Sequence, residues 1–78
     1  MTDLRAAIAR LLDGRREGAS ICPSDVARDV GGDAWRSLMG DVRAAAWAMA
    51  EDGEDVVTQR GAVVGRDVRG PIRIRRPS

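Results

Sequence analysis

The sequence predicts a small α+β domain of the winged helix-turn-helix type, in which three helices precede a two-stranded antiparallel β wing. Apolar residues recur at the period of an α-helix as far as Gly53, where this pattern ends. Beyond Gly53 the chain turns to β-branched and alternating apolar residues, which are typical of strands. At 78 residues the chain has the length of one domain, which we place at residues 1–78.

The first predicted helix spans about residues 3–13. Its apolar residues share one helical face, and they are Leu4, Ile8, Leu11 and Leu12. Thr2 or Asp3 can cap the start of this helix, and Gly14 is placed where a helix would stop.

Two more helices are predicted, joined by a glycine pair. Pro23 suits the first turn of a helix over residues 23–30, because its fixed φ and missing N–H cost nothing there. Gly31-Gly32 ends that helix, and Asp33 caps a longer one over residues 34–52. The apolar positions of the longer helix follow the helical period and are Trp35, Leu38, Met39, Val42, Ala46 and Met49. A short glycine-containing turn between two helices is typical of the helix-turn-helix motif.

Two strands are predicted after the helices, at about residues 56–60 and 71–75. In the second strand apolar and charged residues alternate, so its isoleucines should face the core. Arg73 and Arg75 should then project together on the outer side.

Two shorter segments leave alternatives open. Ala62–Val64 either extends the first strand or packs back on the body of the domain. Ser20–Cys22 forms either a short strand or an extended approach to the second helix.

Five segments, in this order and at this spacing, form a pattern that covers nearly the whole chain. They are Ser20-Ile21-Cys22-Pro23-Ser24-Asp25-Val26-Ala27, Trp35-Arg36-Ser37-Leu38-Met39, Val42-Arg43, Val57-Thr58-Gln59-Arg60-Gly61 and Arg69-Gly70-Pro71-Ile72-Arg73. The pattern resembles the domain-of-unknown-function 3253 family of small bacterial proteins. The resemblance implies a winged-helix-like fold and a bacterial source, and it implies no catalytic residue.

Charge is distributed unevenly along the chain. Residues 1–55 carry seven Arg against eleven Asp and Glu, whereas residues 56–78 carry six Arg against Asp67 alone. A basic wing of this kind can contact the phosphates of a nucleic acid, or pair with carboxylates on a protein. It can also be an edge strand that charge protects from aggregation.

The leading functional hypothesis is binding of nucleic acid, with duplex DNA as the expected ligand, through the basic wing and the helix at residues 34–52. The predicted contact residues are Arg36, Ser37, Arg43, Arg60, Arg66, Arg69, Arg73 and Arg75. Acidic residues such as Asp33 and Asp41 leave that helix net acidic, which opposes contact with phosphates. The alternative is a protein-interaction module or a homodimer in which the same wing meets an acidic surface, such as residues 1–55 of a second copy.

Other classes of function find no support in the residues. The chain has no His and no Lys to activate Cys22, which we expect to be a small packed residue, and we expect no enzyme activity, cofactor or metal site. Trp47 lies off the main apolar stripe and either packs in the core or forms an interface. No apolar run is long enough to cross a bilayer and the start lacks a signal-peptide pattern, so the predicted location is cytoplasmic.

Overall fold

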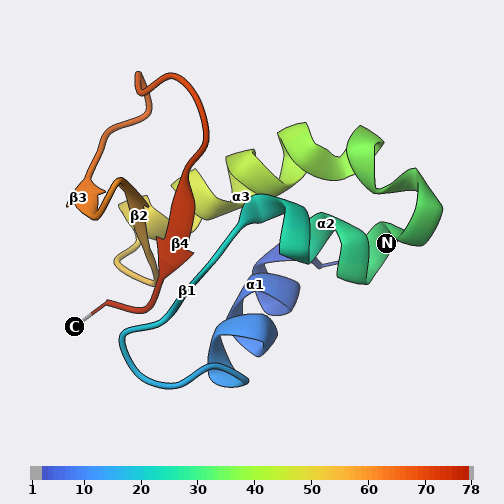
Figure 1. Ribbon diagram of the computed structural model, residues 1–78, viewed down its shortest axis with the longest axis horizontal. Coiled ribbons are helices and arrows are strands. Elements are labelled where there is room, and N and C mark those ends of the chain that lie inside the picture. The colour runs from blue at the N-terminus through green and yellow to red at the C-terminus, as the bar shows by residue number, and fades with distance from the viewer. Residues whose placement is uncertain (1–2, 78) are drawn as a thin grey trace.

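The computed structural model describes residues 3–77, with a small β-sheet at one end of the molecule and the α2–η1 pair at the other (Figure 1). In chain order the elements are α1 (Leu4–Asp13), β1 (Ser20–Ile21), α2 (Pro23–Gly31), the 3-10 helix η1 (Gly32–Leu38), α3 (Met39–Glu51), β2 (Val56–Gln59), β3 (Ala62–Val63) and β4 (Arg73–Arg75). None of these helices is long and apolar enough to cross a lipid bilayer.

The first two helices begin and end close to the predicted residues. The Asp3 carboxylate accepts the backbone N–H of Ala6 at 3.2 Å and so caps α1, while Thr2 lies outside the described residues. At the start of α2, the Asp25 carboxylate accepts the backbone N–H of Cys22 at 2.9 Å. Gly32 ends α2 with a φ of 55°, a conformation that favours glycine.

The prediction of one helix over residues 34–52 is wrong at its start. Residues 32–38 form the 3-10 helix η1, and α3 begins only at Met39. Asp33 makes no capping bond, and Ala34 has non-helical angles of φ −91° and ψ 15°. The Ser37 hydroxyl donates to the Ala34 carbonyl at 2.8 Å, which favours a local turn over the regular helical ladder.

This change of helix type divides the predicted apolar stripe into two parts. Val42, Ala46 and Met49 on α3 are buried as predicted. Trp35 and Leu38, which belong to η1, are only partly buried at the edge of the core. The helix that follows the turn therefore differs from the recognition helix of the predicted fold.

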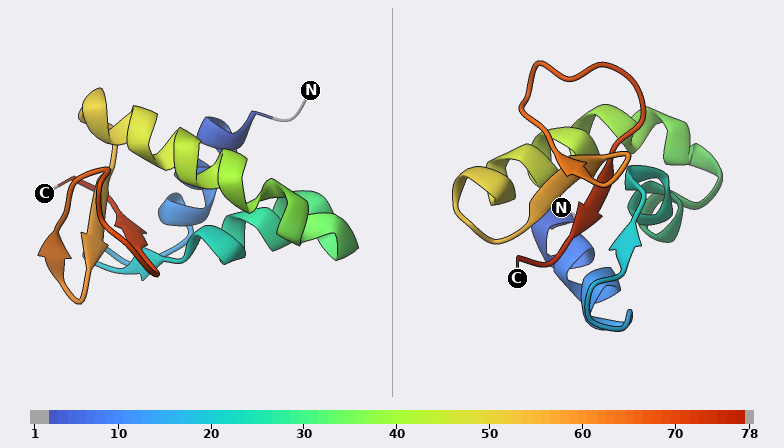
Figure 2. Two further views of the ribbon diagram at one scale, coloured as in Figure 1. Left: turned by 90° about the horizontal axis from the view of Figure 1, so that it is seen from above. Right: turned by 60° about the vertical axis from the view of Figure 1, so that its left-hand side comes forward.

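The predicted two-stranded wing is also wrong, because the sheet has four antiparallel strands in the order β1-β4-β2-β3. β4 is paired on both sides, with β1 and with β2, and Figure 2 shows it between them. Ala62–Val63 takes neither predicted course and forms β3, which pairs with β2 at the edge of the sheet. The α+β class is correct, but the winged helix-turn-helix architecture is not.

A row of apolar side chains explains why β1 joins the sheet. Ile21 is opposite Ile74, which is opposite Val57, and each of these three residues is almost completely buried. Pairing with β1 also satisfies the second edge of β4, whose backbone groups would otherwise lack partners. β1 contains only two residues, too few for a sequence pattern to identify its partner strand.

The hydrophobic core joins the sheet to the helices. Its largest fully buried side chains come one from each of α1, β1, α2, α3, β2 and β4, and they are Ile8, Ile21, Val26, Val42, Val57 and Ile74. The burial of Ile72 and Ile74 confirms that the isoleucines before and within β4 face the core. Neighbouring Arg73 is consequently directed to the outer face of the sheet.

Candidate anion-binding site

Part of the positive charge near the C-terminus is neutralised within the molecule. Arg66 pairs with Glu51 at the end of α3, with a nitrogen–oxygen distance of 2.6 Å. Arg76 pairs with Asp13 at the end of α1. The basic and acidic parts of the sequence therefore meet within a single chain, and the charge available for a partner is smaller than the sequence implies.

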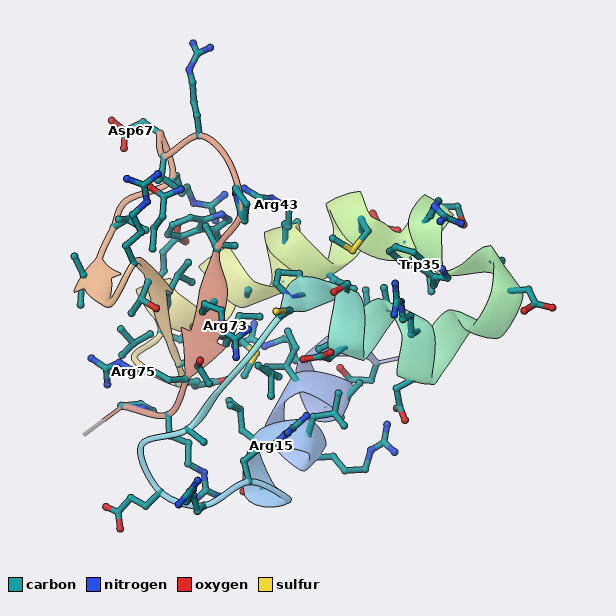
Figure 3. All side chains as sticks on the ribbon, in the orientation of Figure 1. Arg15, Trp35, Arg43, Asp67, Arg73 and Arg75 are labelled. Carbon is teal, nitrogen blue, oxygen red and sulfur yellow. The ribbon has the colours of Figure 1, made fainter. Side chains whose placement is uncertain are left out.

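Arg73 is held by neutral groups on β1 and at the start of α2. Its guanidinium donates to the Ser20 hydroxyl at 2.8 Å, to the Ser20 carbonyl at 2.9 Å and to the Cys22 sulfur at 2.7 Å. Figure 3 shows Arg73 between β4 and the segment that leads into α2, whereas Arg75 extends to the other side of β4. The two side chains are therefore not directed at a common point. Arg73 is fixed in position while its charge has no carboxylate partner among residues 3–77.

Arg75 belongs to a different part of the surface. It is half-buried, donates to the Arg76 carbonyl at 3.2 Å and lines a cavity with Glu17 and Gly18. A carboxylate in this cavity makes it a poor site for an anion.

Arg60 occupies the two-residue turn between β2 and β3. It has a φ of 54° and the next residue, Gly61, has a φ of 84°, as a type I′ hairpin turn requires. Among residues 3–77, Arg60 is the one non-glycine residue with a positive φ. Asparagine or glycine fits this position with less strain, so the arginine side chain is present at some cost in stability.

Replacing Arg60 by Asn should raise the free energy of unfolding by about 0.5–1 kcal/mol, because Asn tolerates the left-handed conformation better. Urea unfolding followed by tryptophan fluorescence measures this change. Replacing Arg69 by Asn is the matched control, since it removes the same charge from an exposed loop residue with no positive φ. An equal or lower stability of the Arg60 variant would contradict strain at the turn.

Arg60 and Arg73 line the same cavity, which has a volume of about 360 Å³. The other residues of its wall are Cys22, Gln59, Pro71 and Ile72. None of these residues carries a carboxylate, so the charged residues of the wall are the two arginines.

The loop between β3 and β4 forms the rim of this cavity and is tied down on two sides. The Gln59 side-chain amide donates to the Arg69 carbonyl at 2.7 Å and to the Pro71 carbonyl at 3.1 Å. Both terminal nitrogens of Arg43 lie 3.4 Å from the Gly70 carbonyl oxygen, beside the loop in Figure 3. Arg43, predicted as a contact residue, therefore positions the loop, while the Arg69 side chain is exposed next to it.

Arg36 and Ser37 lie elsewhere. The guanidinium carbons of Arg36 and Arg28 lie 4.6 and 4.4 Å from the centre of the Trp35 ring, at cation–π distance. Figure 3 places Trp35 at the end of the molecule away from Arg73. Arg36 and Ser37 thus do not join the cavity with Arg60 and Arg73.

Sequence reasoning missed Gln59, and it gave Ser20 and Cys22 no part in the site. Gln59 has no distinguishing signal, being a polar residue at the end of a predicted strand. Ser20 and Cys22 reach Arg73 only because β1 pairs with β4. Within residues 3–77, no three of His, Cys, Asp and Glu come close enough together to hold a metal ion.

Asp55, outside this cavity, is unusual because its ionisable carboxyl group is buried. Its side chain is 3% exposed, and neither carboxylate oxygen has a hydrogen-bond partner among the described residues. Burial raises the pKa of Asp55 to about 7; Glu54 adds to this rise and Arg5 opposes it. Arg5 is itself paired with Asp52 at 2.7 Å and with Glu54 at 2.9 Å.

Comparison with known proteins gives a family match across the chain. The model of a family described as protein of unknown function (DUF3253) matches residues 1–77. No curated protein matches the chain.

Proposed function

The chain belongs to the DUF3253 family, whose function is unknown. From the surface of this chain we propose that it binds nucleic acid, with duplex DNA as the ligand to test first. The proposed contact surface consists of Arg60, Arg69 and Arg73, which we call the arginine surface. It lies on the β2–β3 turn, the β3–β4 loop and β4. This proposal uses the four-stranded sheet and requires no recognition helix.

The observation that carries the proposal is the lack of a carboxylate partner for each of these three charges in the described part of the chain. Arg60, Arg69 and Arg73 form no ion pair within residues 3–77, while four other arginines do. An arginine already paired with a carboxylate must give up that pair to bind a phosphate, whereas an unpaired one need not. Asp67, the acidic residue on the same loop as Arg69, lies toward the outer tip of the loop in Figure 3.

Three phosphate contacts would give a distinct dependence on salt. Each neutralised phosphate releases condensed counterions, so the logarithm of the binding constant should fall against the logarithm of salt concentration with a slope of about −0.9 per contact. Three contacts predict a slope of about −2.7. Binding through three phosphate contacts would be weak near physiological salt and easily measured at low salt.

Replacing Arg73 by Gln should weaken binding to a random DNA duplex at low salt and reduce the size of the salt slope by about 0.9, because one phosphate contact is lost. Fluorescence anisotropy of a labelled duplex, titrated at several salt concentrations, measures both quantities. Replacing Arg10 by Gln is the control, since it removes an equal charge from an arginine already paired with Asp29 on the helical side. Equal slopes for the two variants would show that net charge, and not the arginine surface, drives binding.

A homodimer is the second candidate function, and the observation that favours it is the exposure of Val63. This residue lies on the edge strand β3 and its side chain is 67% exposed, the largest exposure of a bulky apolar residue among residues 3–77. An exposed edge strand can pair with the same strand of another copy. Sedimentation of the samples used for anisotropy distinguishes the candidates, since a concentration-dependent mass without duplex binding would support the dimer.

A further inference from the structure

We propose that the cavity between Arg60 and Arg73 is a binding site for a dianionic phosphate monoester. The inference deepens the proposed function and rests on it for the source of the ligand, because a nucleic acid carries such a group only at a strand end, as a terminal 5′-phosphate. The backbone phosphates of the same strand are diesters, and Arg69 on the β3–β4 loop is the residue of the arginine surface left to contact them.

Charge matching selects the monoester over the diester. Two arginines line the cavity and no Asp or Glu does. A phosphate monoester carries a charge of about −1.5 to −2 at neutral pH, whereas each diester in a backbone carries about −1. A single dianion therefore balances both arginines at one point.

The geometry of Arg73 prepares it for this ligand. Three of its hydrogen bonds go to Ser20 and Cys22, and a guanidinium has five N–H groups, so two remain for a ligand. Two donors on one guanidinium suit the oxygens of a phosphate, which arginine often binds in a bidentate manner. Because the side chain is already held in place, little conformational freedom is left to lose on binding.

The remaining wall indicates what the phosphate is attached to. Both N–H groups of the Gln59 amide are directed at backbone carbonyls, so its carbonyl oxygen is the group it can offer to a ligand. That oxygen accepts hydrogen bonds and would repel a phosphate oxygen, but it can accept from a hydroxyl of an attached sugar. A volume of about 360 Å³ is at the small end of the range for ligand pockets and suits one sugar phosphate better than a longer segment.

Two other cavities lack this charge balance. One is lined by Asp13 and Glu54 together with Arg76, and the other by Glu17 together with Arg75 and Arg76. Carboxylates in their walls oppose the binding of an anion.

A pair of small probes tests the site directly. Methyl phosphate is a monoester and dimethyl phosphate is a diester of similar size, and NMR of the arginine Nε–H groups reports binding at each guanidinium. Methyl phosphate should shift the Arg60 and Arg73 signals to saturation and bind at least about tenfold more tightly than dimethyl phosphate. Replacing Arg60 by Asn or Arg73 by Gln should each weaken the binding of methyl phosphate by about tenfold. Replacing Arg10 by Gln should leave this binding unchanged.

Failure of the inference has a distinct result. If methyl phosphate binds no more tightly than dimethyl phosphate, or shifts signals other than those of Arg60 and Arg73, the monoester site is overturned. Circular dichroism of each variant must match that of the parent protein, and the Arg60 variant is expected to be the more stable of the two.

Oligonucleotides then identify the source of the phosphate. A duplex with 5′-phosphates is compared with the same duplex bearing 5′-hydroxyls, and tighter binding of the phosphorylated form supports a strand end as the ligand. If methyl phosphate binds but neither duplex does, the nucleic-acid function fails while the site stands as one for free sugar phosphates. If both duplexes bind equally and methyl phosphate does not, the site fails while nucleic-acid binding stands.

Discussion

Replacing Asp55 by Asn should stabilise the protein at pH 8 by up to about 4 kcal/mol, and this gain should shrink steadily as the pH falls toward 4. The Asp55 carboxyl is buried without a hydrogen-bond partner among the described residues, so its ionised form is strongly disfavoured in the folded state. Asparagine has nearly the same shape and stays neutral at every pH, so it removes the cost of burying a charge.

The sign follows from the two pKa values of Asp55. Folding raises its pKa from 3.8 to about 7, so between these values the folded protein binds a proton that the unfolded chain has released. Under that condition stability falls as the pH rises, and the loss is complete above the folded pKa. A difference of about three pKa units corresponds to roughly 4 kcal/mol.

Urea unfolding of both proteins at several values between pH 4 and 8 measures the gain. Subtracting the two curves removes the contribution of all other carboxylates, provided that they titrate alike in both proteins. Glu51→Gln is the matched control, because Glu51 is exposed, is paired with Arg66 and does not contribute to the raised pKa of Asp55. That variant should lack the growing gain toward high pH, and a pH-independent effect of Asp55→Asn would contradict an ionised buried carboxyl.

The sequence predicts the helices better than the sheet, and the reason is the range of the interactions. The caps of α1 and α2 act within one turn, so Asp3, Pro23 and Gly32 identify their ends. The position of β4 between β1 and β2 depends on contacts across most of the chain, such as Ile21 with Ile74. A local pattern in a two-residue strand contains no information about so distant a partner.

The same limit applies to the candidate site. Seven of the predicted contact residues come from a simple count of arginines near the wing and on the third helix, but the count cannot separate paired from unpaired charges. Arg66 is neutralised by Glu51 and Arg43 holds the Gly70 carbonyl, whereas Arg73 retains an unpaired charge. These differences arise from the sheet order and the course of the β3–β4 loop, neither of which the sequence pattern contains.

The two tryptophans show how a change of helix type reverses an expectation about packing. The spacing places Trp35 on the main apolar stripe and Trp47 off it, with core and interface both open for Trp47. In the structure Trp47 is 9% exposed and belongs to the core, whereas Trp35 lies partly exposed beside Arg28 and Arg36. The core role of Trp47 is thereby confirmed, and η1 accounts for the displacement of Trp35.

Replacing Trp47 by Ala should therefore unfold most of the protein at room temperature. A buried tryptophan cut to alanine costs about 3–5 kcal/mol, which is comparable to the whole stability expected of a domain this small. Far-UV circular dichroism and urea unfolding measure the loss. Replacing Trp35 by Ala is the matched control and should cost roughly 1–2 kcal/mol, because less apolar area is buried and the cation–π contacts are exposed.

Each single variant also leaves one tryptophan as a reporter on the other site. With Trp35 removed, the emission of Trp47 should be that of a buried indole and should not change with protein concentration, because the core already covers it. With Trp47 removed, the remaining emission should be that of an exposed indole in an unfolded chain. A Trp47 variant that stays folded, or a Trp35 variant that is the less stable of the two, would contradict the core assigned to α3 and the sheet.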